Sequence, residues 1–242
     1  MSVQLTPFWV VIPAAGSARR MGSGAVPKQY LRLAGSSVIE LAILPFLARP
    51  ECRGVVVVLA ESDQRWSELA ISHDRRVSTA IGGTERADSV RAGLIALSSR
   101  LKPSDWVLVH DAARPCLEAR DVESLLRTLA DDEVGGLLAT PVVDTLKRAD
   151  ASARVDTTVD RTGLWRAMTP QMFRFDVLRR ALDVAQRSGL ASTDEAQAVE
   201  ALGLQPRLVA GNADNIKITT PDDIARAERI LYERNGDARS SS

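Results

Sequence analysis

Residues 10–30, VVIPAAGSARRMGSGAVPKQY, bring a run of small residues close to three cations. An apolar segment ends at Pro13, a loop of alanine, glycine and serine follows, and Arg19, Arg20 and Lys28 surround it. A loop with little side-chain bulk can present backbone N–H groups to a phosphate. Nearby cations can neutralise the charge that develops in phosphoryl transfer. The stretch therefore predicts a phosphate-binding loop, although an ordinary β–α loop with surface arginines has the same composition.

The glycine pattern and the scarcity of histidine narrow the class of reaction. Neither the dinucleotide fingerprint GxGxxG nor the P-loop pattern GxxxxGK[ST] is present, which argues against a nicotinamide enzyme and a Walker-type ATPase. The chain has two histidines, and no Ser–His or Cys–His pairing suggests itself. A nucleophile that needs a general base is therefore disfavoured. A phosphate monoester needs none, because it is already largely dianionic near neutral pH.

A carboxylate ends an apolar segment in the middle of the chain. In LVHDAARP, residues 108–115, Asp111 closes a predicted strand, and the carboxyl edge of a parallel sheet is where ligands bind. One carboxylate together with substrate phosphates is a common way to hold Mg²⁺. The alternative is that Asp111 caps the following segment. Strand alternation turns His110 away from Asp111, so we interpret His110 as structural.

The segment GGTERADSV, residues 82–90, is the third candidate for ligand contacts. Gly82 and Gly83 follow a predicted strand, and Ser89 falls in the first turns of a predicted helix. Backbone and hydroxyl groups in this arrangement suit a base or a ribose. A tight turn followed by a helix cap would explain the same residues.

Alternating strands and helices would position these residues. Short β-branched runs predict strands, and their near-continuous apolar character indicates burial on both faces, as in a parallel sheet. The predicted strands are 8–14, 54–60, 76–81, 106–111 and 135–143. Apolar residues at helical spacing predict helices over 86–98 and 119–130. This order predicts an α/β fold with a doubly wound, mostly parallel, Rossmann-like sheet.

Residues 141–166 break this alternation. Two strand-like pieces flank the polar turn RADASAR, which predicts a β-hairpin arm protruding from the domain. A long surface loop is the alternative, although loops of that length in compact domains usually have a use.

Helix signals continue toward the C-terminus. Ser192 and Glu195 have capping-box spacing, and Thr220 with Pro221 predicts the start of the last helix. Between these two helices, Lys217 is expected in or beside a short strand. The polar end of the chain, 235–242, is expected to be a disordered tail.

Composition excludes several partners. The 242 residues carry 31 basic and 31 acidic side chains, so no chain-wide basic field favours nucleic acid or a membrane surface. The longest apolar run, residues 55–60, is too short to span a bilayer, and nothing at the N-terminus resembles a signal peptide. Cys52 and Cys116 lie far apart without metal-ligand spacing, which fits two thiols in a reducing cytoplasm.

Eight motifs, taken in order along residues 8–233, resemble one enzyme family. They are IPAAGSARRM, PKQYL, GGTERADSV, VLVHDAARPC, PVVDTLKR, TVDRTGLWRAMTPQMF, TDEA and ADNIKIT. The chain resembles the 2-C-methyl-D-erythritol 4-phosphate cytidylyltransferase family of the non-mevalonate isoprenoid pathway. One such motif alone would be weak evidence, but eight in the family's order are highly specific.

The resemblance implies that CTP and 2-C-methyl-D-erythritol 4-phosphate give 4-diphosphocytidyl-2-C-methyl-D-erythritol and pyrophosphate, with Mg²⁺. Arg20 and Lys28 match the residues that stabilise the transition state, and Asp111 matches a metal-linked carboxylate that also contacts the substrate. Arg161 and Lys217 match the residues that hold the substrate phosphate for attack. Further substrate contacts are implied at Arg114, Thr145 and Thr193. The implied cytidine nucleotide site comprises Pro13, Ala14, Ala15, Gly16, Ser17, Gly82, Gly83, Thr84, Arg86 and Ser89.

The resemblance also implies a homodimer in which the arm, 141–166, reaches into the partner's active site. Residues 1–140 and 167–234 would then form one nucleotidyltransferase domain with the arm inserted in it. The closest alternative is a ribitol 5-phosphate cytidylyltransferase with the same chemistry. A catalytically inactive nucleotide-binding protein is a more distant alternative, and a nicotinamide oxidoreductase is more distant still.

Overall fold

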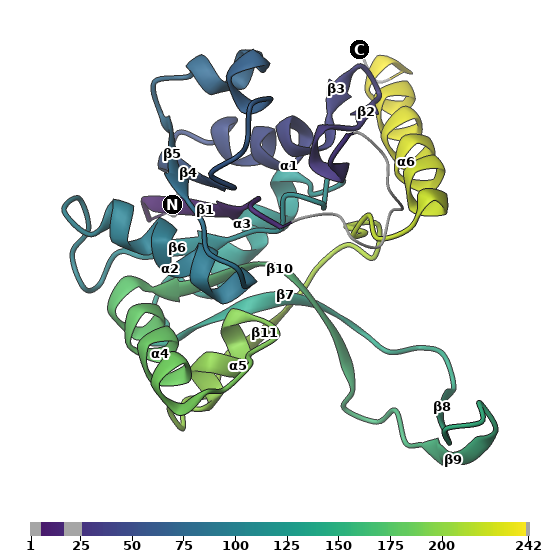
Figure 1. The fold of residues 1–242 in the computed structure, drawn as a ribbon. Coiled ribbons are helices and arrows are strands. Elements are labelled where there is room, and N and C mark those ends of the chain that lie inside the picture. The colour runs from purple at the N-terminus through teal and green to yellow at the C-terminus, as the bar shows by residue number, and fades with distance from the viewer. Residues whose placement is uncertain (1–5, 17–25, 241–242) are drawn as a thin grey trace.

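A seven-stranded sheet forms the centre of the molecule in a computed structural model that describes residues 6–16 and 26–240 (Figure 1). The strand order is β11-β7-β10-β6-β1-β4-β5, and only β10 runs antiparallel to its neighbours. The strands are β1 (Phe8–Pro13), β4 (Cys52–Leu59), β5 (Val77–Ile81), β6 (Trp106–Val109), β7 (Gly135–Pro141), β10 (Trp165–Arg174) and β11 (Arg207–Ala210). The predicted doubly wound, mostly parallel fold is confirmed.

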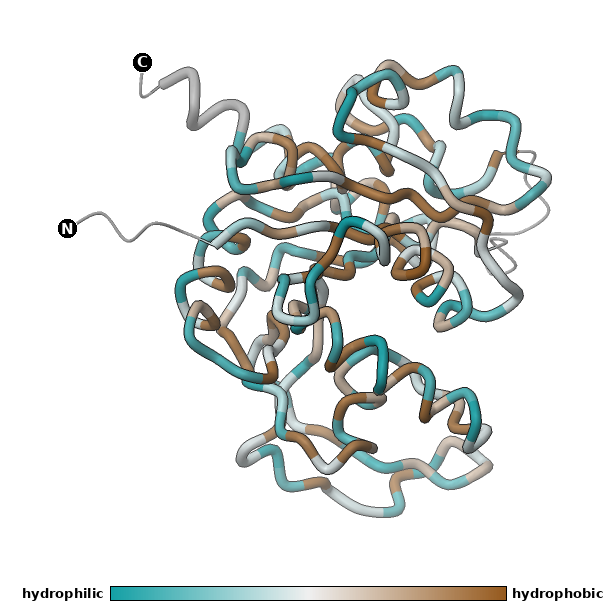
Figure 2. The backbone as a smooth tube through the Cα atoms, turned by 90° about the vertical axis from the view of Figure 1, so that its left-hand side faces the viewer, coloured by the Kyte–Doolittle hydropathy of each residue, from teal (hydrophilic) through white to brown (hydrophobic). Residues whose placement is uncertain are grey.

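Helices cover both faces of this sheet. The apolar faces of α1 (Val38–Leu47) and α3 (Ala119–Thr128) pack into one buried cluster. The apolar faces of α2 (Arg86–Leu97), α4 (Phe175–Ser188) and α5 (Glu195–Glu200) pack into a second cluster on the opposite face. Figure 2 shows that hydrophobic stretches run through the middle of the molecule, along the strands and the inner helix faces.

The middle of β4 explains why the strands read as continuous apolar runs. Val55 and Val57 face the α1–α3 cluster, whereas Val56 and Val58 face the α2–α4–α5 cluster. Successive side chains of a strand point to opposite faces, so a strand covered on both faces must be apolar at every position. All four valines are almost completely buried.

The segment between β7 and β10 leaves the sheet. Pro141 and Trp165 are still paired across these strands, and beyond them β8 (Leu146–Ala149) and β9 (Val155–Val159) form a separate two-stranded antiparallel sheet. In the turn, the Asp150 carboxylate accepts the backbone N–H groups of Ser152 and Arg154. Figure 1 shows residues 142–164, which make up most of the predicted arm, extending away from the body of the molecule.

The C-terminal part differs in detail from its prediction. The N-cap of α5 is Asp194, whose carboxylate accepts Gln197 N–H, and not Ser192. Lys217 lies in a segment without regular structure that precedes α6 (Pro221–Ser240), not in a strand. Helix α6 continues through residue 240 and so includes most of the predicted tail.

Helix α6 packs beside a small hairpin. This hairpin is formed by β2 (Arg32–Leu33) and β3 (Ser36–Ser37), and a third buried cluster joins it to α6. Short 3-10 turns lie at Lys28–Tyr30, Trp66–Glu68 and Ala70–His73. Within the described ranges, no helix combines the length and the apolar character that a membrane span requires.

Candidate active site

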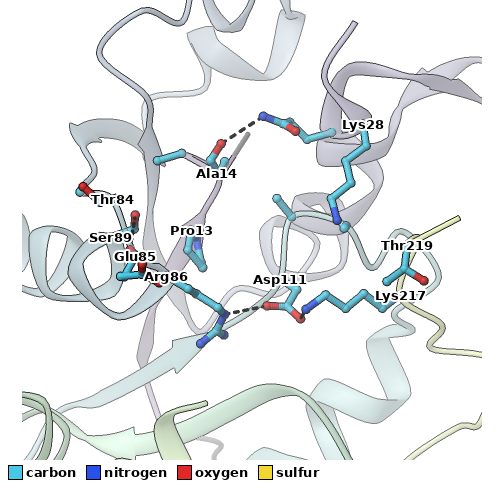
Figure 3. A pocket seen from close by; sticks show the side chains of 16 residues that line it. Pro13, Ala14, Lys28, Thr84, Glu85, Arg86, Ser89, Asp111, Lys217 and Thr219 are labelled. Carbon is cyan, nitrogen blue, oxygen red and sulfur yellow. Dashed lines mark hydrogen bonds and ion pairs between the residues drawn. The ribbon is translucent and has the colours of Figure 1, made fainter. Parts of the chain in front are cut away.

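A cavity of about 570 Å³ opens at the carboxyl ends of β1, β5 and β6 (Figure 3). Adjacent parallel strands end at the same edge, so the loops that follow them meet there. The lining residues are Pro13, Ala14, Ala15, Gly16, Lys28, Gln29, Gly83, Thr84, Glu85, Arg86, Ser89, Asp111, Ala112, Ala113, Lys217 and Thr219. The sequence-predicted segments 13–16, 82–89 and 111–114 therefore converge on one cavity.

Two loops form a wall with little side-chain bulk. Ala14 N–H donates to Val58 O at 2.8 Å, and Gly82 N–H donates to Leu59 O at 2.8 Å, which extends both loops from the sheet edge. A Cβ atom added to Gly82 would lie 2.6 Å from Ala15 Cβ and 2.7 Å from Ser89 Oγ. Glycine at this position therefore allows the loops to touch, although Gly82 itself lies behind the cavity lining.

Asp111 is the centre of a cluster of charged side chains. Its Oδ1 accepts Arg86 Nε at 3.1 Å, and its Oδ2 lies 2.9 Å from Lys217 Nζ and 3.4 Å from Arg114 Nε. Burial raises the pKa of the Asp111 carboxyl group, but the positive charges of Arg86, Lys217 and Arg114 lower it by more. The pKa of Asp111 therefore lies well below its usual range. The Lys217 side chain lines the cavity and remains 40% exposed.

A buried hydrogen-bond chain holds Asp111 in place. Asp111 N–H donates to Thr169 Oγ1, which lies 3.0 Å from His110 Nδ1, while His110 Nε2 lies 3.2 Å from Arg114 O. Burial lowers the pKa of His110 to about 4, so the ring is neutral near pH 7. Because a carbonyl can only accept, Nε2 carries the ring proton and Nδ1 accepts the Thr169 hydroxyl. His110 is thus structural, as its position in the strand suggested.

The segment that carries Lys217 is fixed to the same turn. Ile218 N–H donates to Ala113 O at 2.8 Å, and Arg114 Nη1 donates to Asn215 O at 2.7 Å. Asn215 Nδ2 in turn donates to Thr169 O. These bonds place Lys217 beside Asp111, although the two residues are far apart in the sequence.

Lys28 enters the cavity from another side. It lies in the 3-10 turn Lys28–Tyr30, and its Nζ donates to Ile218 O at 3.2 Å. In Figure 3 its side chain points toward Lys217 on the same side of the cavity, while Arg86 approaches from the opposite side. Gln29 of the same turn donates from Nε2 to Ala14 O at 3.1 Å, which ties this turn to the loop after β1. The cavity thus receives cationic side chains from three separate segments.

Some predicted site residues lie elsewhere. Ser17 and Arg20 fall outside the described residues. Thr145 and Arg161 are exposed on the arm, away from the cavity, and Arg161 Nη1 donates to Val143 O. Thr193 is exposed and bonds to Gln197 Oε1 just before α5. Arg114 touches Asp111 from behind the cavity lining.

The site also contains residues that were not predicted from the sequence. Gln29, Glu85, Ala112, Ala113 and Thr219 line the cavity, and all of them lie within the recognised motifs or directly beside them. Glu195, inside the motif TDEA, forms a buried ion pair with Arg86. The position of these lining residues in the motifs could have suggested them from the sequence. The contact between Arg86 and Glu195 could not be predicted in this way, because the two residues are 109 positions apart and only the fold brings them together.

A family model described as 2-C-methyl-D-erythritol 4-phosphate cytidylyltransferase matches residues 8–233. The chain belongs to this family. Proteins of that name from Ectopseudomonas mendocina and Pseudomonas aeruginosa are 53% and 54% identical to it over 231 and 226 residues. These alignments cover 95% and 93% of this chain, and 98% and 96% of the relatives. The resemblance predicted from the eight motifs is confirmed.

Solved structures agree with the assignment to the cytidylyltransferase family. A structure titled 4-diphosphocytidyl-2C-methyl-D-erythritol synthase has a TM-score of 0.81 at 35% identity, covering 94% of this chain and 100% of that one. The 2-C-methyl-D-erythritol 4-phosphate cytidylyltransferase of Francisella tularensis has a TM-score of 0.80 at 32% identity, covering 93% and 100%. The similarity therefore includes the whole fold around the cavity.

Proposed function

We propose that this chain transfers the cytidylyl group of CTP to 2-C-methyl-D-erythritol 4-phosphate. A phosphate oxygen of the substrate attacks the α-phosphorus of CTP, the bond to the β-phosphate bridging oxygen breaks, and pyrophosphate leaves. The products are 4-diphosphocytidyl-2-C-methyl-D-erythritol and pyrophosphate. The observation that carries this proposal is the cavity in which a loop of bare backbone faces Arg86, Lys28 and Lys217. Such a site gathers and neutralises phosphates without a general base.

The nucleotide would occupy the side of the cavity formed by 13–16 and 82–89. There the small residues leave room for a base and ribose, and the backbone can approach the phosphates closely. Lys28, together with Arg20, would stabilise the negative charge that develops around the α-phosphorus. We assign these roles because the residues match the corresponding positions of the family's motifs.

The cavity's donor set suits a magnesium ion held mainly by the nucleotide. Among the described residues, no group of three or more histidine, cysteine, aspartate or glutamate side chains could hold a metal. Asp111 offers a deep ionised carboxylate, and Mg²⁺ commonly combines one protein carboxylate with phosphate oxygens and water. We assign Asp111 as its protein ligand. When bound, the ion neutralises phosphate charge and favours the departure of pyrophosphate.

The substrate phosphate would lie on the Lys217 side of the cavity, beside Asp111. Arg114 and Thr193, which are not among the lining residues, would supply further substrate contacts. In this proposal, Thr145 and Arg161 complete the site across a homodimer interface, with the arm 141–166 inserted into the partner's domain. The exposed apolar side chains on this arm support the assignment, because apolar patches of this kind are commonly covered by a partner. They are Val143, Val155, Leu164 and Trp165.

A pyrophosphate-release assay with CTP, Mg²⁺ and methylerythritol phosphate tests the function directly. Turnover with this substrate, and much weaker turnover with ribitol 5-phosphate, is the expected result. Preference for ribitol 5-phosphate would favour the alternative enzyme, and no turnover with either would favour an inactive nucleotide-binding protein.

We place the reaction in the cytoplasm, where the two buried, unpaired cysteines would stay reduced.

A further inference from the structure

Glu195 is a buried carboxylate that is not among the described residues lining the cavity. Only 1% of its side chain is exposed, and both of its oxygens face one guanidinium group. Arg86 Nη1 lies 2.5 Å from Oε1, and Arg86 Nη2 lies 3.1 Å from Oε2. Burial of a carboxylate is costly unless a partner compensates for the lost water. This two-bonded pairing supplies that compensation and holds the plane of the guanidinium group.

Arg86 connects Glu195 to the cavity. While its two terminal nitrogens bond to Glu195, its Nε donates to Asp111 Oδ1 at 3.1 Å. One guanidinium group therefore bridges a carboxylate behind the cavity and a carboxylate inside it. The other oxygen of Asp111 lies 2.9 Å from Lys217 Nζ and 3.4 Å from Arg114 Nε, so Asp111 links Arg86 to Lys217. Arg86 also begins α2, next to the 82–85 loop.

The sheet fixes the backbone around Glu195. Gln171 of β10 accepts Ala196 N–H on its Oε1 at 2.8 Å, and its Nε2 donates to Asp194 Oδ2 at 2.9 Å. The residues on both sides of Glu195 are thus bonded to one buried side chain. Asp194 also caps α5 by accepting Gln197 N–H. The position of the Glu195 carboxylate is therefore determined by the central sheet.

We propose that Glu195 is a positioning residue for the substrate side of the site. It holds Arg86 in the orientation that keeps Asp111 between Arg86 and Lys217, and Lys217 thereby remains directed at the substrate phosphate. Without Glu195, Arg86 would have Asp111 as its remaining carboxylate partner in this cluster and would compete with Lys217 for it. The inference rests on the proposed function, because it assigns Lys217 to the methylerythritol phosphate.

The test compares Glu195→Gln with the wild-type enzyme in steady-state assays that vary CTP and methylerythritol phosphate separately. The glutamine amide keeps the shape but directs an N–H₂ group at Arg86, so the two-bonded pairing is lost. We expect the KM for methylerythritol phosphate to rise about tenfold, the size associated with losing a hydrogen bond to a charged group, while the KM for CTP, whose proposed site also includes Arg86, rises by less.

Asp183→Asn provides the matched control. Arg91 is also on α2, and its Nε lies 3.2 Å from Asp183 Oδ1 of α4, so this pair joins α2 to a neighbouring helix without touching the cavity. Its KM values should equal those of the wild-type enzyme. Urea unfolding of both variants reports whether stability alone has changed.

The outcomes separate the two proposals. A Glu195→Gln enzyme with reduced stability but unchanged KM values would make Glu195 merely structural and would overturn the inference, while leaving the function intact. If Glu195→Gln does not fold, Glu195→Asp replaces it, since the shorter carboxylate keeps the charge but not the reach, and the same rise in KM is expected. Absence of turnover by the wild-type enzyme would overturn both proposals.

Discussion

The Asp111 cluster and the arm differ in how their charged side chains are held. In the cluster, Asp111 contacts three cations, and its backbone N–H bonds to Thr169. On the arm, Arg161 Nη1 donates to Val143 O of the same arm, and β8 and β9 pair with each other in a separate sheet. One region is preorganised by its own chain, as electrostatic stabilisation of a transition state requires. We propose that the other region is completed by contact with a second copy of the chain.

The difference has a simple energetic basis. The Asp111 cluster rests on a sheet edge with buried clusters on both faces. A two-stranded hairpin is marginally stable by itself in water, and this one leaves Val143 and Val155 75% and 64% exposed. Covering such side chains with a second chain would stabilise both arms together. A two-fold contact between arms is self-complementary and closes as a dimer.

The largest effect should come from removing a cation of the preorganised region. Lys28→Ala should lower kcat by roughly 10²-fold or more, in line with the loss of one strong electrostatic stabiliser of the transition state. Its KM for CTP should change much less. Steady-state kinetics with varied CTP measure both values.

Lys147→Ala is the control for this prediction. Lys147 lies on the arm, where its Nζ donates to Thr158 Oγ1 at 2.6 Å, so the substitution removes the same charge from the region that is not preorganised. Its kcat should stay close to that of the wild-type enzyme. An intact kcat with a raised KM for CTP in Lys28→Ala would instead make Lys28 a ground-state anchor.

The second prediction tests whether the arm serves another chain. Lys28→Ala and Arg161→Ala should each be nearly inactive, the latter because it loses a phosphate contact that fixes the direction of attack. If Arg161 acts across the interface, one of the two sites in a mixed dimer carries both wild-type residues. Random exchange between equal amounts of the variants should then restore about a quarter of wild-type activity.

Subunit exchange must be demonstrated separately, for example by native mass spectrometry of differently tagged chains. If Arg161 serves its own chain, every site in the mixture keeps one lesion and activity stays low. Low activity after proven exchange would therefore contradict the shared site, whatever the shape of the dimer.

A smaller effect is expected from Asp111, which belongs to the preorganised region but has two proposed tasks. Asp111→Asn should raise the Mg²⁺ concentration needed for half-maximal activity by about tenfold, because the metal loses the charged ligand that we assign to it. A titration of activity against Mg²⁺ measures this shift. If the Mg²⁺ requirement is unchanged while the KM for methylerythritol phosphate rises, Asp111 acts only by holding Arg86 and Lys217.

The sequence predicted the regions where local pattern and fold agree. The strands at β1, β4, β5, β6 and β7 and the helices α2 and α3 were recognised within a few residues of their ends. Their apolar periodicity results directly from burial on the sheet. The meeting of the loops after β1, β5 and β6 at one cavity could be predicted from these strands, because parallel strands place their carboxyl ends at the same edge of a sheet.

The remaining features depend on contacts that no local pattern records. The strand β10 was not predicted, since its first residues fall within the proposed arm and its sequence mixes Arg166, Pro170 and Gln171 with apolar residues. The antiparallel pairing of β10 determines which residues flank α5 and hence where Glu195 lies. Asp194 replaced the predicted Ser192 cap because its carboxylate reaches Gln197 N–H, which local spacing alone did not distinguish.

The smallest predicted effect concerns how the preorganised region is held at the start of α6. Asp223 Oδ2 accepts Thr219 N–H, the Thr219 hydroxyl and Thr220 N–H, each at 2.8 Å, and Thr219 lines the cavity. Burial has the largest single effect and raises the pKa of Asp223, but the hydrogen bonds from Thr219 and Thr220 together outweigh it and lower the pKa to about 2. Since that value lies below the pKa of an unfolded aspartate, about 3.9, the ionised side chain stabilises the folded state.

Asp223→Asn should therefore lower the free energy of unfolding by about 1 kcal/mol at pH 7, a value reduced from the full pKa difference because the group is partly exposed. This contribution to stability is complete above the pKa of the unfolded aspartate and is lost as the pH falls through about 2. The difference in the free energy of unfolding between variant and wild type should therefore be about half as large at pH 3 as at pH 7. Urea unfolding at both pH values, at one protein concentration, measures it. Asp222→Asn removes the same charge from the same turn. It should lower the free energy of unfolding by less, because the hydrogen bonds from Thr219 and Thr220 to Asp223 remain. Equal losses in the two variants at pH 7 would mean that charge near the helix N-terminus, and not the bonds to Thr219 and Thr220, holds this wall of the cavity.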